Sequence, residues 1–524
     1  MKPEFDIVII GAGLTGGLAA DYFTRIGKNV CIIERGGDYF PDRKNLWSER
    51  HINVPGTNRW VTVSKDDPYE RTEIKTEDSD YKFKYNMKFG MGGAGAVWSG
   101  ASFRFRPADF RLRSMYGVGD DWPITYDDLE PWYALAENEL GVSGSDPFSY
   151  WQRSSDYPMD AFRQSFLDGV FMRHFGKKFP LMPIPCAVAS EKYRGRGPCI
   201  GAHSCVSFCP SEARYNPNQN HLTDAIERES CTLYKRAMVT RLNMDDNTYH
   251  VKSVTVLPEG SAPIEVKAEK FILAGNTVEN TRLLLLSGNS RFPQGLANSS
   301  GLVGKNFMST GACVWNLEFP EFTYPFRGRP ITSVCAEYSD GNHRRFMSSF
   351  LIEVWNDVWT HGGLYYYIEK LVAQGHWGTT LKGMVDEYMR KMIITAPFEI
   401  LPRMESTITL DPDDTDAFGL ALPVNHIKLG DYEYGVREYI EKRLKNASPD
   451  ILISVSGAGI NGNHPYGTYR MGKNSREGVV DANLRSFDHE NLYIMGGGSF
   501  VTGTCFNPTL TIAALALKAL ASMG

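Results

Sequence analysis

The sequence predicts an α/β fold in which a parallel-sheet domain is assembled from separated segments of the chain and a second domain is inserted between them. Three observations point to this arrangement. Residues 5–10 (FDIVII) form a nearly continuous apolar run, typical of a parallel strand buried on both faces, and a glycine-rich turn and a helical pattern follow it. Glycine-rich motifs return near 90–100, near 270–280 and towards the C-terminus. Residues 311–455, in contrast, contain no glycine-rich phosphate loop.

The composition is that of an ordinary globular protein. Of the 524 residues, 42% are hydrophobic and 22% charged, which excludes collagen-like, coiled-coil and disordered chains. The formal net charge of −5 supplies no broad electropositive field, so nucleic acid is not expected as a partner. No stretch approaches the roughly 20 apolar residues that span a bilayer. The chain also enters its first strand directly, so we expect no membrane span and no signal peptide of its own.

The first turn carries a dinucleotide-binding pattern. After the strand, Gly11 permits a tight turn, Gly13 lets the backbone approach a pyrophosphate, and Gly16 allows close packing of helix on strand. The helix N-terminus would supply N–H donors to the phosphates. A second apolar strand ends in Glu34, where an acid can accept hydrogen bonds from the adenosine ribose. The alternative is a strand–turn–helix unit without a ligand, but the complete pattern favours a dinucleotide.

A second glycine-rich loop favours FAD over NAD. FAD is buried along its length and needs several contact loops, whereas NAD needs little beyond the first unit. The segment GGAGAVWSG brings backbone N–H groups close together, and further glycines occur at 275 and 496–503. The alternative is a tight structural turn. The loop residues expected to contact the cofactor are Gly92, Gly93, Gly95, Trp98 and Ser99.

Two polar residues near the C-terminus suit flavin chemistry. His464 lies in NGNHPYGTYRMG, and a histidine near a flavin can act as a general base because its pKa lies in the physiological range. Asn507 precedes Pro508 and an apolar helix, whose N-terminus could face a ring that becomes anionic on reduction. A single histidine is often structural, so chemistry alone leaves both interpretations of His464 open.

Five segments together resemble the glucose–methanol–choline (GMC) oxidoreductases, in that family's order and over nearly the whole chain. They are VIIGAGLTGG, GGAGAVWSG, KFILAGNTVENTRLLLLSGN, NHPYGTYRMG and VVDANLRSFDHENLYIMGGGSFVTGTCFNPTLTIAALAL. The resemblance implies that His464 is the catalytic base and that Asn507 is paired with it near the flavin. It also assigns Asp481, Gly497 and Gly498 to cofactor-contacting segments, and we expect Asn463, beside His464, to contact substrate.

The same resemblance implies a two-domain architecture, with an antiparallel sheet in the substrate domain. We expect the FAD-binding domain to comprise residues 1–120, 195–310 and 456–524, with a cysteine loop at 199–210. We expect the substrate domain to comprise residues 121–194 and 311–455.

Two further segments narrow the resemblance. RFRPADFRLRSMYGVGDDWPITYDDLEPWY and CIGAHSCVSFCPSEARYNP are similar to the catalytic subunits of bacterial membrane-associated sugar and sugar-acid dehydrogenases. In that group a cysteine set near the flavin holds a 3Fe–4S cluster that relays electrons to a cytochrome c subunit, and a small companion subunit carries the export signal. The resemblance therefore implies a position at the periplasmic face by co-export. A cytoplasmic position is the alternative, since we expect no signal in this chain.

Three bunched cysteines would be the cluster ligands. Cys199, Cys205 and Cys209 are separated by five and three residues, and thiolates are soft ligands suited to Fe–S clusters or zinc. Three ligands match three irons, with no fourth cysteine nearby in the sequence. A zinc site completed by His203 and a set of unliganded thiols are the alternatives.

The chain departs from its relatives at two places. Val97 stands before Trp98, where relatives often have the histidine that can link covalently to flavin, so we expect non-covalent FAD. Ser309 and Thr310 stand where relatives commonly have His-Pro, so we expect the local architecture on the substrate side to differ from that of the relatives.

These observations predict an FAD-dependent dehydrogenase that oxidises a hydroxyl of a sugar or polyol, with electrons passing through a 3Fe–4S cluster to a cytochrome or other acceptor. One alternative is an O₂-reducing oxidase of the same fold without the cluster. An alternative of another class is a non-redox flavoprotein, or an electron-transfer or assembly subunit without a substrate of its own.

Overall fold

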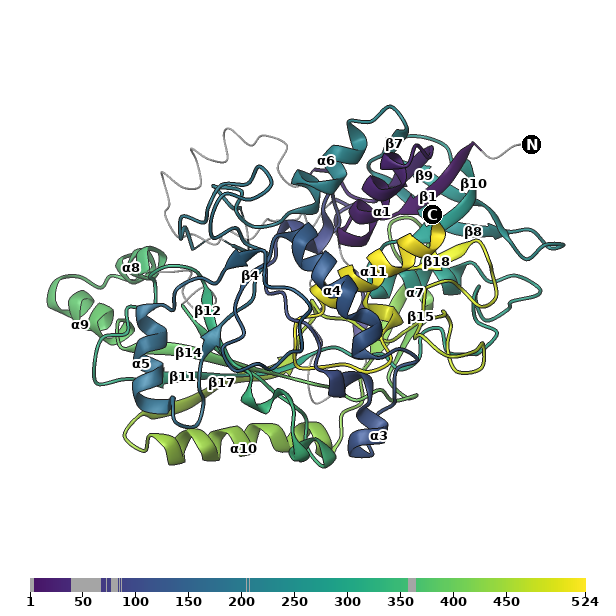
Figure 1. Cartoon of the computed structure of the whole chain (residues 1–524). Coiled ribbons are helices and arrows are strands. Elements are labelled where there is room, and N and C mark those ends of the chain that lie inside the picture. The colour runs from purple at the N-terminus through teal and green to yellow at the C-terminus, as the bar shows by residue number, and fades with distance from the viewer. Residues whose placement is uncertain are drawn as a thin grey trace.

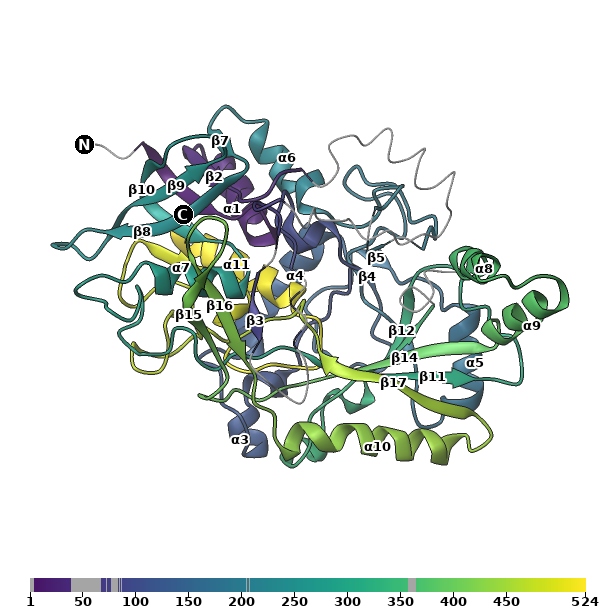
Figure 2. The same cartoon turned by 180° about the vertical axis from the view of Figure 1, so that it is seen from behind.

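The computed structural model of the chain describes residues 4–38, 67–71, 73–76, 83, 85, 87–203, 205–206, 208–356 and 364–524. Two larger sheets dominate these residues and lie side by side, with helices packed around them (Figures 1 and 2). The predicted α/β class and the antiparallel second sheet are confirmed. The domain boundaries remain predictions, and part of the first segment, 1–120, lies outside the described residues.

The first sheet has the strand order β7-β2-β1-β10-β9-β8, and β18 pairs with β10. Strands β7, β2, β1, β10 and β18 are parallel to their neighbours, whereas β9 and β8 join as an antiparallel extension. These strands are β1 (Phe5–Ile10), β2 (Val30–Ile33), β7 (Cys231–Tyr234), β8 (Ala237–Met244), β9 (Val251–Pro258), β10 (Ile264–Leu273) and β18 (Leu492–Ile494). The parallel core is thus built from three distant parts of the sequence.

Helices α1, α4, α7 and α11 pack beside this sheet or on one another. Helix α1 (Leu14–Arg25) follows β1 directly and packs against α11 (Thr509–Met523), which also packs against α4 (Tyr126–Leu140). Helix α7 (Thr277–Leu286) begins just after β10, and the Asn276 side chain accepts the N–H groups of Val278 and Glu279 there. Such caps satisfy backbone donors that a helix leaves unpaired.

The second sheet has the order β17-β11-β14-β13-β12-β6, and all its neighbouring strands are antiparallel. Its strands are β6 (Met182–Pro183), β11 (Gly311–Glu318), β12 (Ile331–Cys335), β13 (Ile352–Trp355), β14 (Lys391–Phe398) and β17 (Leu452–Ile460). Helices α5 (Phe166–Phe175) and α10 (Asp431–Ala447) cover one face of it (Figure 1).

Side chains alternate between the two faces of this second sheet, as pleating requires. Trp315, Val354 and Ile394 belong to the apolar core that the sheet shares with α5 and α10. Val314 and Thr395, one residue away, point to the opposite face, which forms one wall of a large cavity. The sheet therefore separates a structural core from the candidate site.

The remaining elements are shorter. The other helices are α3 (Leu112–Tyr116), α6 (His221–Ile226), α8 (Leu364–Ala373) and α9 (Gly378–Tyr388). The other strands are β3 (Lys75–Thr76), β4 (Ser143–Gly144), β5 (Met159–Asp160), β15 (Thr407–Thr415) and β16 (Ala421–His426). The 3₁₀ helices are η2 (Gly93–Ala96), η3 (Pro107–Phe110), η4 (Pro217–Gln219), η5 (Glu337–Ser339), η6 (Asn342–Arg345) and η7 (Gly497–Ser499).

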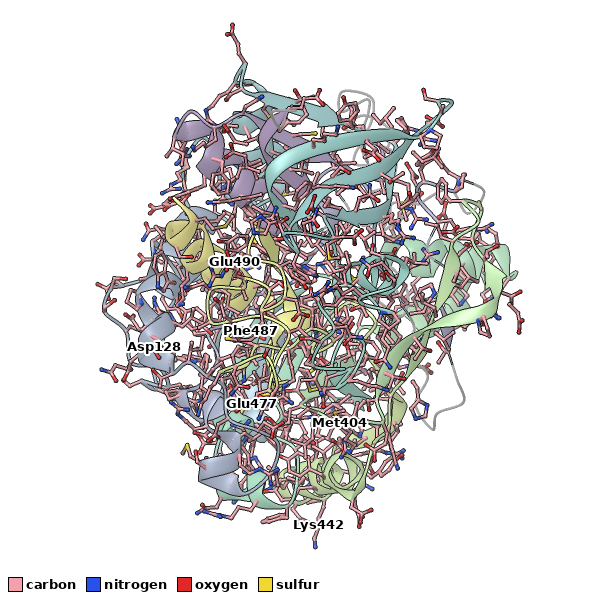
Figure 3. All side chains as sticks on the ribbon, turned by 90° about the vertical axis from the view of Figure 1, so that its right-hand side faces the viewer. Asp128, Met404, Lys442, Glu477, Phe487 and Glu490 are labelled. Atoms are coloured by element: carbon pink, nitrogen blue, oxygen red, sulfur yellow. The ribbon has the colours of Figure 1, made fainter. Side chains whose placement is uncertain are left out.

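Charged side chains of both signs point outward on the side of the molecule that carries β18 and α11. Asp128, Lys442, Glu477 and Glu490 are exposed there (Figure 3). Within the described part of the chain, no helix is both long and apolar enough to cross a bilayer.

Candidate active site

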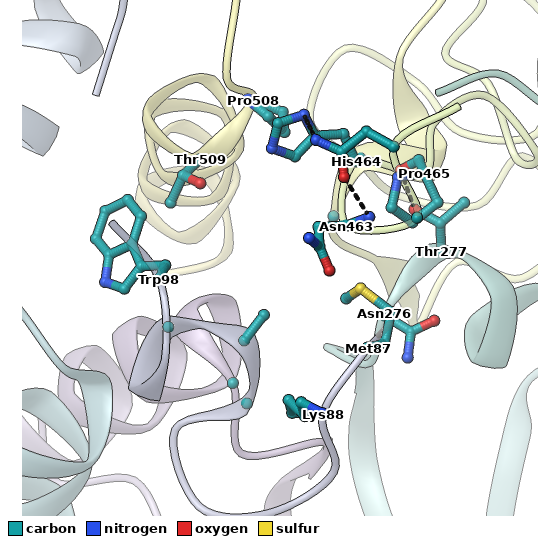
Figure 4. A pocket seen from close by; sticks show the side chains of 18 of the residues that line it. Met87, Lys88, Trp98, Asn276, Thr277, Asn463, His464, Pro465, Pro508 and Thr509 are labelled. Carbon is teal, nitrogen blue, oxygen red and sulfur yellow. Dashed lines mark hydrogen bonds between the residues drawn. The ribbon is translucent and has the colours of Figure 1, made fainter. Parts of the chain in front are cut away.

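A cavity of about 1210 Å³ extends from the glycine-rich turn after β1 to the inner face of the second sheet. Its wall includes residues of the first turn, the 93–99 loop, the N-terminus of α7 and the segments around 464 and 507. Figure 4 shows Trp98 on one side of this space, with Asn463 and His464 across from it and Met87 and Lys88 along another edge. The cavity is long enough to bring distant motifs to one ligand.

The first turn has the geometry that its glycines predict. Gly11 has φ +105°, a conformation that other residues rarely adopt. A Cβ on Gly16 would clash with the carbonyl oxygen of Gly11, so helix and turn are in contact. A Cβ on Gly13 would be 3.9 Å from the nearest protein atom, the carbonyl oxygen of Ala274, and Gly13 lines the cavity. Gly13 thus leaves room for a ligand, and the turn fits a dinucleotide pyrophosphate.

Glu34 lines the cavity and connects three backbone segments. One of its carboxylate oxygens accepts the N–H of Ala12 (2.8 Å), and the other accepts those of Gly36 (2.8 Å) and Gly90 (3.0 Å). Burial raises the pKa of Glu34, and the three N–H donors oppose that rise. Glu34 therefore holds the first turn against the second glycine loop, in addition to its predicted contact with ribose.

The second glycine loop packs directly on the first. Gly92 (φ +91°) and Gly93 (φ +53°) both have left-handed backbone conformations. A Cβ on Gly93 would be 3.2 Å from the Cα of Gly13. The indole N–H of Trp98 donates to the carbonyl of Tyr215 at 2.8 Å, which fixes the ring. The loop residues that line the cavity are Gly93, Ala94, Gly95, Val97, Trp98 and Ser99, whereas Gly92 lies behind them.

His464 and Asn507 lie next to one another in the cavity wall. Nδ2 of Asn507 lies 3.4 Å from Nε2 of His464, although the two residues are 43 positions apart in the sequence. Burial lowers the pKa of His464 to about 4, so the imidazole is neutral at physiological pH. A neutral imidazole has one nitrogen that can accept a proton. The neutral imidazole and the Asn507 amide therefore face one another at the cavity wall.

The far side of the His464 ring contacts residues whose role the sequence did not reveal. Nδ1 lies 3.2 Å from Oγ1 of Thr310 and 3.3 Å from Nδ2 of Asn461. The Thr310 hydroxyl also hydrogen bonds to the buried Tyr466 hydroxyl at 2.7 Å. Asn461 accepts the N–H of Asn463 through Oδ1, so its NH₂ group faces the ring. When Nδ1 of His464 carries the ring proton, it can donate that proton to the Thr310 hydroxyl. It cannot donate to the Asn461 NH₂ group, because an amide NH₂ is itself only a donor.

Replacing Thr310 by valine is expected to slow flavin reduction by substrate about tenfold or more, the effect of losing one hydrogen bond of about 1.4 kcal/mol. Without the hydroxyl, only the NH₂ group of Asn461 faces Nδ1, so the proton of the neutral ring moves to Nε2. A protonated Nε2 cannot take the proton of the substrate hydroxyl. Thr310→Ser keeps the hydroxyl and should retain the rate. Anaerobic stopped-flow measurement of flavin reduction checks this. Equal rates in the valine and serine variants would refute this role.

Other predicted cofactor and substrate residues are divided between the cavity and its surroundings. Asn463 and Gly497 line the cavity, and a Cβ on Gly497 would be 2.7 Å from the carbonyl oxygen of Pro465. Gly498 packs against Tyr469 behind the wall. Asp481 does not line the cavity; its Oδ1 accepts the N–H groups of Asn483 and Arg485 in a turn.

The bunched cysteines lie in one loop beside the second glycine loop. Cys199 and Cys209 pack in a small apolar cluster together with Cys186, a fourth cysteine that spacing did not bring to notice. Cys205 is buried, and its neighbour Val206 lines the cavity. Among the described residues, however, no group of three or more His, Cys, Asp or Glu side chains is arranged to hold a metal ion. The structure therefore does not show the predicted 3Fe–4S site. Nor does it show the zinc alternative, and Nδ1 of His203 bonds to the carbonyl of Gly328 at 2.8 Å.

Two buried arginines accompany these thiols. The Arg214 guanidinium donates to the carbonyls of Ala96 and Trp98 in the glycine loop and to that of Cys205 in the cysteine loop. The buried guanidinium of Arg329 acts electrostatically on the thiols of Cys186, Cys199 and Cys205. Nε and Nη1 of Arg329 and Nε of Arg214 are buried and have no hydrogen-bond partner within the described ranges. These orphaned donors and the soft thiols fit an anionic thiolate-bound group in their chemistry, although the thiols are not arranged as a ligand set.

The fold and the glycine-lined cavity together are those of a dinucleotide-binding protein. The family model "GMC oxidoreductase" matches residues 182–310 with its N-terminal part and 433–516 with its C-terminal part. The chain is 30% identical to the fructose dehydrogenase large subunit of Gluconobacter japonicus over 98% of this chain and 96% of that one. It is 26% identical to the 2-methyl-1,2-propanediol dehydrogenase of Mycolicibacterium austroafricanum over 98% of this chain and 94% of that one. A crystal structure of formate oxidase shares the fold with TM-score 0.67 at 15% identity, covering 99% of this chain and 97% of that one.

The chain belongs to the GMC oxidoreductase family. It is an FAD-dependent oxidoreductase that acts on the CH–OH group of a sugar or other alcohol. The glycine-lined end of the cavity, with its open Gly13, is the part that fits FAD.

Proposed function

We propose that the protein is a dehydrogenase that oxidises a hydroxyl of a sugar or polyol, with His464 as general base. The observation that carries the proposal is the meeting of His464 and Asn507, at 3.4 Å, in the same cavity as the glycine-rich turns. The fructose dehydrogenase large subunit, 30% identical over nearly the whole chain, favours a sugar as the substrate class.

In the proposed reaction, Nε2 of His464 takes the hydroxyl proton and the Asn507 amide orients the alcohol oxygen. When bound, FAD supplies the acceptor for the hydride, which leaves the carbon that bears this hydroxyl, so the alcohol becomes a ketone, aldehyde or lactone. The Thr310 hydroxyl accepts Nδ1–H and keeps Nε2 free. Asn463, at the cavity wall, is positioned to contact the substrate. FAD is held non-covalently, since the aliphatic side chain of Val97, which lines the cavity, has no nucleophilic atom that could form the link.

For the electron acceptor, we propose that Cys199, Cys205 and Cys209 bind a 3Fe–4S cluster. A cluster of this kind accepts electrons one at a time. The buried guanidinium groups of Arg214 and Arg329 support an anionic group at this position. Arg214 also ties the cysteine loop to the glycine loop, which keeps the two sites adjacent. The thiols would have to turn towards one another to complete the site.

We further propose that the chain works with a small companion subunit and a cytochrome c acceptor at the periplasmic face, to which it is exported together with the companion. The support is the relative's designation as a large subunit, which implies a smaller one. A cytoplasmic position is the alternative.

An anaerobic absorbance and EPR experiment on the purified protein, with iron and acid-labile sulfide analysis, tests both parts. We expect a flavin spectrum that a sugar or polyol bleaches, overlaid by iron–sulfur absorption, with an EPR signal from the oxidised cluster. Flavin that no sugar or polyol reduces would refute the proposed dehydrogenase. Bleaching without iron would refute the cluster alone.

A second candidate is an oxidase that reduces O₂ directly. It is favoured by the thiols of the cysteine loop, which among the described residues are not arranged as a metal-binding group. Iron-free protein that produces stoichiometric H₂O₂ from a sugar in air would establish it.

A further inference from the structure

A buried carboxylate in the cavity has no part in the reaction described so far. Glu353 lies on β13, and only 6% of it is exposed. Its neighbours Ile352 and Val354 point into the core beneath the sheet, so Glu353 points to the opposite face and lines the cavity. Across the sheet it is paired with Thr395 of β14, which also lines the cavity.

Glu353 is held by two neutral donors at one oxygen. Oε2 accepts the Thr395 hydroxyl at 2.7 Å and the indole N–H of Trp355 at 3.1 Å. The same indole N–H lies 2.8 Å from Oγ1 of Thr395. The second oxygen, Oε1, has no partner among the described residues. The side chain is therefore locked in place with one acceptor still available on the cavity side.

No cation in the described part of the chain compensates this carboxylate. Among the described residues, Glu353 forms no ion pair, and burial raises its pKa with only Thr395 and Trp355 acting in the opposite direction. The basic residues in the cavity wall are Arg35, Lys88 and Arg282. Arg35 pairs with Glu279 at 3.8 Å, Arg282 pairs with Asp416 at 2.7 Å, and Lys88 precedes the glycine loop.

A purely structural role explains Glu353 poorly. A buried carboxylate without a cation is costly, and an apolar residue at this place in a sheet would generally be more stable. The rest of this wall is largely apolar, with Val314, Ile331 and Ile393 around the Glu353–Thr395 pair. Cavities with an apolar lining and a few fixed polar groups are typical of sites that orient a ligand.

We propose that Glu353 is a substrate-binding residue, which accepts a hydrogen bond through Oε1 from a donor group of the substrate away from the reacting carbon. The donor is a hydroxyl of the sugar or a protonated amine of an amino sugar. The Trp355 indole, fixed by the same network, provides an apolar surface beside that group. The inference rests on the proposed oxidation of a sugar or polyol and identifies which wall of the cavity recognises it.

The test compares Glu353→Gln with Glu318→Gln, a control on β11 of the same sheet that does not line the cavity. Glutamine can still accept from Thr395 and Trp355 but loses the charge, so the fold should be retained. The holoenzymes are titrated anaerobically with glucose, glucosamine and ethanol, which lacks a remote donor. Binding is read from the perturbation of the flavin spectrum, and flavin reduction is followed separately.

We expect the Kd of Glu353→Gln for the sugar that binds to rise about 10- to 100-fold, as for losing a hydrogen bond to a charged group. The limiting rate of flavin reduction and any response to ethanol should remain unchanged. A larger loss with glucosamine than with glucose identifies an amine donor, and an equal loss identifies a hydroxyl. Unchanged Kd values would overturn the role of Glu353, as would failure of both sugars to bind the wild type. Sugars that bind in a Glu353-dependent manner without reducing the flavin would instead refute the proposed oxidation alone.

Discussion

Replacement of His464 by alanine is expected to leave FAD bound while the rate constant of flavin reduction by substrate falls about 10²- to 10⁴-fold, the range typical of general base catalysis. The ring is the titratable group that lies 3.4 Å from Asn507 in the cavity. Its removal leaves a small cavity but does not alter the glycine turns that hold the nucleotide. Stopped-flow reduction under anaerobic conditions measures the effect.

The matched control is His250→Ala, because His250 is exposed and remote from the cavity. That variant should reduce its flavin at the wild-type rate. Unchanged reduction in the His464 variant would mean that another group, or no group, removes the hydroxyl proton.

The low pKa of His464 also sets the expected pH dependence. Burial lowers this pKa to about 4, so the ring is charged only below about pH 4. Flavin reduction should therefore be independent of this group at neutral pH and fall as the pH drops through about 4. Because the folded pKa lies below the unfolded value of about 6.5, this histidine also favours unfolding as the pH falls below about 6.5. The His464→Ala variant should lose that contribution.

The second large effect is expected at the first glycine turn. Two alanine substitutions there should each lower the content of bound FAD, one by destabilising the fold and the other by blocking the cofactor. In Gly16→Ala the new Cβ meets the carbonyl oxygen of Gly11, a backbone atom that cannot rotate away. Overpacking of this kind costs about 1–3 kcal/mol, so the melting temperature should drop and little holoenzyme should form. In Gly13→Ala the Cβ has 3.9 Å to the nearest protein atom, so the chain should fold normally.

Gly13→Ala should nevertheless lose FAD, because the new Cβ would fill the space in which the pyrophosphate comes close to the backbone. A cost of about 1.4 kcal/mol is already tenfold in affinity. Circular dichroism, thermal unfolding and flavin content together separate the two variants. Full flavin content in Gly13→Ala would show that the pyrophosphate lies elsewhere.

The sequence predicted the parts of the site that depend on short segments. Gly11, Gly13 and Gly16 lie within one turn. Their spacing was enough to predict the tight turn and the close packing of helix on turn that the structure shows. The α/β class followed equally from apolar runs such as 5–10. In these places local sequence and tertiary structure agree, because the same few residues make the contacts.

Features that depend on distant contacts were not predictable in the same way. Thr310 lies 154 residues before His464, and the sequence marked it only as a departure from relatives. Glu353 is opposite Thr395 because of the register between β13 and β14, which the alternating pattern alone does not determine. The cysteine spacing suggested a ligand set of three. The fold instead places Cys186 among them, and the metal-binding arrangement stays a prediction.

The alternation along the second sheet has a consequence for how enzymes of this kind can diversify. Residues such as Trp315, Val354 and Ile394 are committed to the packing under α5 and α10. Their neighbours Glu353 and Thr395 face only the cavity. Selection, or a library design, can therefore vary every second residue of β11, β13 and β14 to change substrate preference while the intervening residues preserve stability. One sheet thus carries two nearly independent sets of positions, one that determines folding and one that determines substrate recognition.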